Sequence, residues 1–227
     1  MKQNIEPQNI AQRRHRILEE IESAAKKASR NPDDISLVAA CKTQTNEIII
    51  EALAAGQNTF GENRVAEAYE HFMAQATPRP ELRMIGPLQS KKAEDAVAIF
   101  DVIESLDRPS LALAVSKAMQ KLSKQPKLLV QVNIGDEPQK SGISVSGLPQ
   151  FLAELQDKYD LKINGLMCIP PANQVAGPYF ALLQKLAARH NLQELSMGMS
   201  DDFKTAIQFG ATHVRIGSAL FGERPSL

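Results

Sequence analysis

The sequence predicts an α/β protein, a single (β/α)₈ TIM barrel preceded by an N-terminal helix. Eight short β-rich runs alternate with helical stretches, and 227 residues shared among eight units gives about 28 residues per unit, the length of a βα repeat. Such alternation implies a parallel sheet, and eight units imply its closure into a barrel. An open doubly wound sheet is the alternative, but its Gly-x-Gly-x-x-Gly fingerprint does not follow the first strand.

Composition limits the classes of function. Lys and Arg together number 26, as do Asp and Glu, so there is no electrostatic case for a nucleic-acid or anionic-membrane partner. The 43% apolar share suffices for a packed core. We expect one domain spanning residues 1–227, with residues 1–30 packed on the barrel, and a monomer or weak dimer.

The two cysteines, Cys41 and Cys168, lie in apolar runs and exclude a disulfide scaffold or a Cys-rich zinc site. The N-terminus lacks the apolar core of a signal peptide. No apolar run approaches the roughly 18 residues of a membrane span. The expected setting is cytoplasmic.

The first thirty residues predict an amphipathic helix whose apolar positions recur at helical spacing: Ile10, Ile17, Ile21, Ala24, Ala25 and Ala28. The basic run at 13–16 is interpreted as a solvated helix face because acidic residues follow it. The segment 31–34, Asn-Pro-Asp-Asp, ends this helix.

The remaining elements follow in strict alternation. Strands are expected at 35–41, 58–60, 82–86, 100–104, 127–134, 161–169, 194–197 and 212–216. Helices are expected at 46–55, 63–74, 93–98, 110–122, 147–158, 174–190 and 202–209. Glycines lie just past several strands, at 61, 86, 135, 198 and 217. They favour turns in general, but they also let a ligand approach the backbone at the C-terminal face, where barrel enzymes place their sites.

Lys42 ends the first strand. Alternation places it on one face with Val38 and Ala40, while Leu37 and Cys41 lie on the more apolar opposite face. We expect the first face to point into the barrel, with the lysine at the mouth, shielded from water. Desolvation favours the neutral amine that Schiff-base formation requires. A lysine that reaches solvent or pairs with a carboxylate is the alternative.

A second candidate site is the C-terminal third, at the ends of strands seven and eight. Barrels frequently bind phosphate between the loops that follow those strands. Ser200 and Ser218 offer hydroxyls, and Gly217 lets its loop come close. An ordinary helix cap by Asp201 or Asp202 remains an alternative explanation of the polar residues.

Arg215 shares a strand face with Gly217, opposite Val214 and Ile216. If the apolar face meets the helices, Arg215 points inward near the anion site. Burying a charged arginine without an anion beside it is unfavourable in free energy, so an inward Arg215 suggests an anionic or heteroaromatic ligand. His213 lies one layer deeper, where we expect a hydrogen-bonded structural histidine. The other histidines show no metal-ligand spacing.

Short motifs lie along the chain at 40–43 (ACKT), 60–63 (FGEN), 85–89 (IGPLQ), 131–133 (QVN), 140–142 (KSG), 165–167 (GLM), 195–202 (LSMGMSDD), 214–217 (VRIG) and 221–222 (FG). Together, and in this order, they resemble the pyridoxal phosphate homeostasis proteins from about residue 35 to 224. This resemblance implies a barrel similar to the barrel domain of alanine racemase that binds pyridoxal 5′-phosphate (PLP) without an established enzymatic activity.

By position, the resemblance implies that Lys42 forms the Schiff base with PLP. It implies that Ser200, Gly217 and Ser218 hold the phosphate, that Arg215 lies against the pyridine side, and that Asn63 lines the ring pocket. A helix cap is the alternative for Asn63. The sequence departs from the family at 82–84, Leu-Arg-Met in place of Trp-His-Phe, and at Lys91 in place of Asn. These departures put any role of the third loop in doubt.

Two functions remain open at this point. The resemblance implies an arginine beside the ring, which favours the unprotonated pyridine, so carbanion stabilisation should be weak. Racemases of the alanine type work under the same constraint and add a tyrosine base from a second domain. A PLP carrier is preferred because the sequence offers one lysine and a phosphate site but no evident second base. A carrier would pass PLP to apo PLP-dependent enzymes. The alternative is a PLP-dependent amino-acid racemase, but no tyrosine ends a predicted strand and we expect no room for a second domain. Lys140, in a loop expected to be mobile and exposed, is either a surface lysine or a residue that receives PLP in transit.

Overall fold

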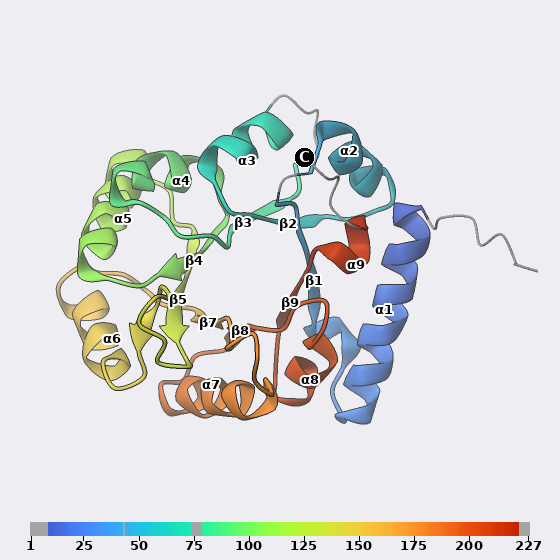
Figure 1. Cartoon of the computed structure of the whole chain (residues 1–227). Coiled ribbons are helices and arrows are strands. Elements are labelled where there is room, and N and C mark those ends of the chain that lie inside the picture. The colour runs from blue at the N-terminus through green and yellow to red at the C-terminus, as the bar shows by residue number, and fades with distance from the viewer. Residues whose placement is uncertain (1–8, 43, 74–78, 223–227) are drawn as a thin grey trace, which may run out of the picture.

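A computed structural model describes residues 9–42, 44–73 and 79–222. Within these ranges, eight parallel strands form a closed ring surrounded by helices (Figure 1). In ring order the strands are β1 (Ser36–Ala40), β2 (Thr59–Glu62), β3 (Glu81–Met84), β4 (Val102–Leu106), β5 (Lys127–Asn133), β7 (Gly165–Cys168), β8 (Glu194–Ser196) and β9 (His213–Ile216). The ring closes because β9 pairs with β1, and β4 pairs with β5. The two-residue β6 (Ile143–Ser144) pairs with the end of β5.

One helix precedes the first strand, and the other helices alternate with the strands of the ring along the chain. The helices are α1 (Ile10–Lys27), α2 (Asn46–Ala54), α3 (Val65–Phe72), α4 (Ala93–Ile99), α5 (Pro109–Leu122), α6 (Leu148–Asp157), α7 (Gly177–Arg189), α8 (Phe203–Gln208) and α9 (Ser218–Phe221), with 3-10 turns η1 (Pro32–Asp34) and η2 (Ser90–Lys92). In the described part of the chain, no helix combines the length and the apolar character needed to cross a bilayer.

The predicted barrel and its eight strands are confirmed, and two strand starts are corrected. Phe100 was expected to begin β4, but its N–H donates to the carbonyl of Ala96 and closes α4. Leu161 was expected to begin β7, but its N–H donates to the carbonyl of Leu155 at the end of α6. An apolar residue that closes a helix has the same local pattern as one that opens a strand. The short elements β6 and α9 were not predicted.

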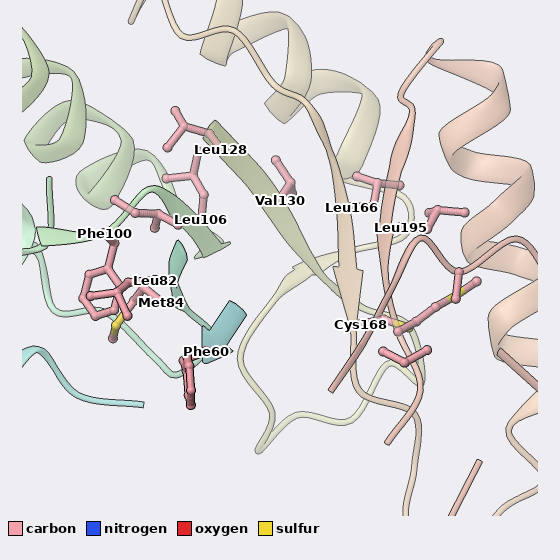
Figure 2. Packing of buried hydrophobic residues seen from close by; sticks show 14 of the residues in the cluster. Phe60, Leu82, Met84, Phe100, Leu106, Leu128, Val130, Leu166, Cys168 and Leu195 are labelled. Atoms are coloured by element: carbon pink, nitrogen blue, oxygen red, sulfur yellow. The ribbon is translucent and has the colours of Figure 1, made fainter. Parts of the chain in front are cut away.

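The barrel wall separates two apolar clusters. Outward-facing strand residues pack against the helices, and Figure 2 shows Phe60, Leu82, Met84, Leu128, Val130 and Leu166 among them. A small interior cluster consists of Val102, Leu129 and Met167. Because alternate residues face opposite sides of a strand, Arg83 between Leu82 and Met84 points into the barrel.

Helix α1 packs beside α8 and α9, at the place where β9 meets β1 (Figure 1). Its expected apolar face is confirmed, since Ile10, Ile17 and Ile21 are buried. The interpretation of the basic run as a solvated face is wrong for two of its members. Arg13 Nε donates to the carbonyl of Leu220 at 2.6 Å, and Arg14 Nε donates to Gln57 Oε1 at 3.1 Å.

Candidate functional site

A cavity of about 360 Å³ opens at the C-terminal ends of the strands. Its size lies within the range of small-molecule sites. The six residues predicted for the site all line it: Lys42, Asn63, Ser200, Arg215, Gly217 and Ser218. They come from the ends of β1, β2, β8 and β9, which closure of the ring brings to one mouth.

Lys42 lies two residues beyond the end of β1, on the face that points into the barrel. Val38 is fully buried below it, and Ala40 lines the cavity, so the small residues expected beneath the lysine are there. Lys42 itself is exposed at the rim. The expected shielding of this side chain from water is therefore wrong. It lies at the mouth above the barrel wall, where the loops within the described ranges leave it exposed.

The segment that carries Lys42 is attached to β2 and α3. The N–H of Cys41 donates to the carbonyl of Gly61, and the carbonyl of Gln44 accepts from His71 Nε2 at 3.1 Å. His71 Nδ1 lies 2.6 Å from Glu62 Oε1, and this hydrogen bond raises the pKa of His71 above 6.5. The buried histidine thus connects α3, the end of β2 and the lysine segment.

Asn63 follows β2 and lines the cavity. The alternative role as a helix cap is excluded, since the N-cap of α3 is Arg64 and no side chain caps this helix. A Cβ at Gly86 would lie 2.4 Å from the carbonyl oxygen of Asn63. Glycine at position 86 therefore lets the loop after β3 pass directly against Asn63.

Ser200 and Ser218 lie side by side across the ends of β8 and β9. Ser218 Oγ donates to Ser200 Oγ at 3.3 Å, and the N–H of Ala219 donates to Ser200 Oγ at 3.4 Å. The alternative of a simple cap fails, because no side chain caps α8 and Asp202 instead accepts from the N–H of Met199. Here the Ser218 hydroxyl and the Ala219 N–H both donate to Ser200 Oγ, so an anion that took the place of this contact would meet two hydroxyls and one backbone N–H at one point.

Arg215 points inward, as expected from the burial of Val214 and Ile216 on the opposite face. Its Nη1 donates to Ser196 Oγ at 2.7 Å, and Nη2 donates to the carbonyl of Cys168 at 2.8 Å. The guanidinium therefore forms part of the cavity floor.

His213 lies one layer below Arg215, and its Nδ1 is 2.8 Å from Thr212 Oγ1. Burial and the charge of Arg83 lower the pKa of His213 to about 4. The ring is therefore neutral at pH 7, which agrees with the structural role expected for it.

Several lining residues were missed, among them Gln44, Ile85, Ile169, Met199 and Asp201. Continued alternation along β3 would have found Ile85, two residues after Arg83 on the inward face. No comparable signal exists for Gln44 and Met199, because loop residues have no fixed period.

The expectation of a mobile, exposed loop around Lys140 is wrong for this lysine. Lys140 is half-buried, and its Nζ contacts the carbonyl of Pro170 at 3.0 Å and Glu137 Oε2 at 2.5 Å. Lys91 is exposed in η2, away from the cavity.

A larger hollow of about 630 Å³ lies at the opposite end of the barrel, beside α6 and α7. Barrel sites form at the C-terminal face, so we place the site around Lys42.

The chain matches known proteins over almost its whole length. Residues 15–225 match the family model of the alanine racemase N-terminal domain. The pyridoxal phosphate homeostasis protein of Vibrio cholerae is 40% identical, and that of Escherichia coli K12 is 35% identical; each match covers 95% of this chain and 97% of the relative. The structure of PipY from Synechococcus elongatus with PLP bound is similar with a TM-score of 0.76 and 36% identity, covering 89% of this chain and all of that one.

Proposed function

This chain belongs to the pyridoxal phosphate homeostasis protein family, and from that premise we propose that it binds PLP covalently through Lys42 and acts as a PLP carrier. One observation carries the proposal. The lysine at the end of β1 and the two serines after β8 and β9 line the same cavity.

The donor set around the cavity fits PLP. The amine of Lys42 matches the aldehyde, and the Ser200 and Ser218 hydroxyls match the phosphate. A Cβ at Gly217 would lie 3.4 Å from the carbonyl of Ala40, between the strand that carries the lysine and the serines. The absence of a side chain at Gly217 therefore leaves space at the point where a bound molecule would bridge the two sides.

Each residue has a distinct part in holding the cofactor. PLP supplies an aldehyde conjugated to a pyridine ring, which reacts reversibly with amines. Lys42 would hold the cofactor by condensing its neutral amine with the aldehyde: a carbon–nitrogen double bond would form, and the aldehyde oxygen would leave as water with the two amine protons. Ser200 and Ser218 donate to the phosphate, and each charge-assisted hydrogen bond contributes about 1.5–3 kcal/mol. Asn63 orients the ring edge beside the lysine.

Arg215 favours a carrier over a catalyst. A guanidinium is a permanent donor that cannot accept a proton, so it leaves the pyridine nitrogen unprotonated. A protonated pyridine is what makes the ring a strong electron sink. With Arg215 on the cavity floor, the ring would stabilise a carbanion only weakly, and the described lining residues include no tyrosine to act as a second base.

A carrier needs an exit for its cargo. The exposure of Lys42 at the rim lets an incoming amine reach the carbon that the lysine holds. We therefore propose apo PLP-dependent enzymes, whose own lysine is such an amine, as the acceptors. The two free, buried thiols of Cys41 and Cys168 fit a reducing cytoplasmic setting.

Borohydride reduction followed by peptide mass spectrometry tests the covalent link. Protein incubated with PLP should carry one pyridoxyl phosphate group on the peptide containing Lys42, together with visible absorbance before reduction. Lys42→Ala should lose the label and the absorbance. Lys117→Ala, which removes an exposed lysine on the outer face of α5, should keep both. Stoichiometric labelling that persists in Lys42→Ala contradicts the proposal.

A further inference from the structure

A line of buried polar side chains crosses the barrel interior beneath the cavity. Arg83 on β3, Glu104 on β4, Ser196 on β8 and Arg215 on β9 are exposed by 1%, 0%, 0% and 5%. These strands lie on opposite sides of the ring, so only closure brings the four residues together. Arg215 alone among them lines the cavity.

The hydrogen bonds along this line have one possible direction. Arg215 Nη1 donates to Ser196 Oγ at 2.7 Å, and Ser196 Oγ lies 2.5 Å from Glu104 Oε2. An arginine can only donate and a serine hydroxyl carries one proton, so Ser196 accepts from Arg215 and donates to Glu104. The Ser196 hydroxyl therefore links the two charged groups, so the position of the Glu104 carboxylate fixes that of the Arg215 guanidinium.

Glu104 is anchored from the other side. Arg83 Nε donates to Glu104 Oε1 at 2.5 Å, and Arg83 also faces Glu81 at 2.8 Å and Glu194 at 3.6 Å. Burial by itself would raise the pKa of the Glu104 carboxyl, but the charges of Arg83 and Arg215 and the bond from Ser196 hold it below 4.5. Glu104 is therefore an anion at neutral pH, fixed between two buried cations.

We propose that Ser196 and Glu104 are positioning residues that hold the Arg215 guanidinium in one orientation on the cavity floor, facing the pyridine edge of bound PLP. The proposal rests on the proposed function and adds to it the residues that act through Arg215. Two of the five N–H donors of Arg215 are used for the bonds to Ser196 and Cys168, which fixes the plane of the guanidinium. Its edge toward the cavity is thereby set before the ligand arrives.

A different result is expected if this line of buried polar side chains only stabilises the fold. If the four residues only fill the barrel, their loss lowers folding stability and leaves the environment of the pyridine nitrogen in the remaining folded protein unchanged. If Ser196 positions Arg215, its loss changes that environment in correctly folded protein. The ¹⁵N resonance of the pyridine nitrogen separates the two cases, because it reports hydrogen bonding and protonation at that atom.

The test compares Ser196→Ala, Ser196→Thr and the matched control Ser105→Ala, each loaded with ¹⁵N-labelled PLP. Ser105 is also buried and follows Glu104, but its hydroxyl has no hydrogen-bond partner in the described structure. We expect Ser196→Ala to shift the pyridine ¹⁵N resonance and weaken PLP affinity roughly tenfold, as loss of a bond to a charged group implies. Ser196→Thr, which keeps the hydroxyl, and Ser105→Ala should retain the wild-type resonance and affinity.

Glu104→Gln alters the hydrogen bond between Ser196 and Glu104 at its acceptor, and it should shift the ¹⁵N resonance in the same direction as Ser196→Ala. Thermal unfolding identifies the variants that fold. A folded Ser196→Ala or Glu104→Gln variant with the wild-type resonance and affinity overturns the positioning role while leaving PLP binding at Lys42 intact. A wild-type chain that does not bind PLP at all overturns the proposed function and this inference together.

Discussion

At the scale of single residues, two glycines that follow neighbouring strands serve different purposes. Gly198 has φ +92°, and a Cβ there would lie 2.5 Å from Ala206 Cβ and 2.9 Å from Phe203 Cα. Gly217 has φ −110°, and its Cβ would meet ordinary contacts beside Ala40. A side chain at position 198 is thus disfavoured by both backbone conformation and packing, whereas a Cβ at position 217 would fit and would add to the cavity lining.

Alanine substitutions should separate these two roles. We expect Gly198→Ala to lower the free energy of unfolding by about 2–3 kcal/mol, because it adds backbone strain and overpacks α8. Gly217→Ala should change it by less than about 1 kcal/mol and should instead weaken PLP binding. Urea unfolding and PLP titration measure the two effects. Equal stability losses in both variants would contradict the distinction.

At the scale of elements, the loop that offers Ser218 depends on a helix from the other end of the chain. The four-residue α9 begins at Ser218, and Arg13 of α1 donates to the carbonyls of Leu220 and Phe221 at its end. A cation at the C-terminus of a helix satisfies carbonyls that have no partner within the helix. The N-terminal helix therefore supports one side of the anion site.

Removing this support should affect phosphate recognition specifically. We expect Arg13→Ala to lower the free energy of unfolding by about 1–2 kcal/mol and to weaken the binding of PLP. Binding of pyridoxal, which lacks the phosphate, should be unchanged. Arg16→Ala is the matched control. Arg16 is exposed, and its ion pair with Glu20 is a weak one, with 3.9 Å between Arg16 Nε and Glu20 Oε1. Parallel titrations with PLP and pyridoxal provide the measurement, and an equal loss for both ligands would refute this role.

At the scale of the whole molecule, the ring of strands gathers one amine and several hydrogen-bond donors at its mouth. Among the described residues that line the cavity, the side chains able to act as bases are Lys42 and Asp201. The three tyrosines, Tyr69, Tyr159 and Tyr179, do not line it. A racemase needs a base on each face of the α-carbon, and this arrangement provides no tyrosine for the second face.

The loaded protein should therefore exchange the α-proton of amino acids no faster than free PLP does. Incubation of the holoprotein with alanine in deuterated water, followed by mass spectrometry, measures this exchange. Deuterium incorporation at a catalytic rate that requires Lys42 would contradict the carrier and support the racemase alternative. Asp201→Asn would then test whether that carboxylate serves as the second base.

Much of the fold and of the candidate site could be predicted from periodicity. Alternation along β1 and β9 correctly assigned Val38 and Arg215 to the interior, and counting strands correctly predicted the closed ring. The loop glycines and serines were found because each lies at a strand end, and strand ends of a parallel barrel share one face. The sequence alone was sufficient for these features because they depend on local pattern and order along the chain.

Only the tertiary structure decided three further features: the exposure of Lys42, the support of α9 by Arg13, and the line from Arg83 through Glu104 and Ser196 to Arg215. Each depends on residues far apart in sequence, such as Glu104 and Ser196, that meet across the closed ring. Local periodicity says which way a side chain points but not what it meets there. The partner is set by closure of the barrel, which brings opposite strands within hydrogen-bonding distance.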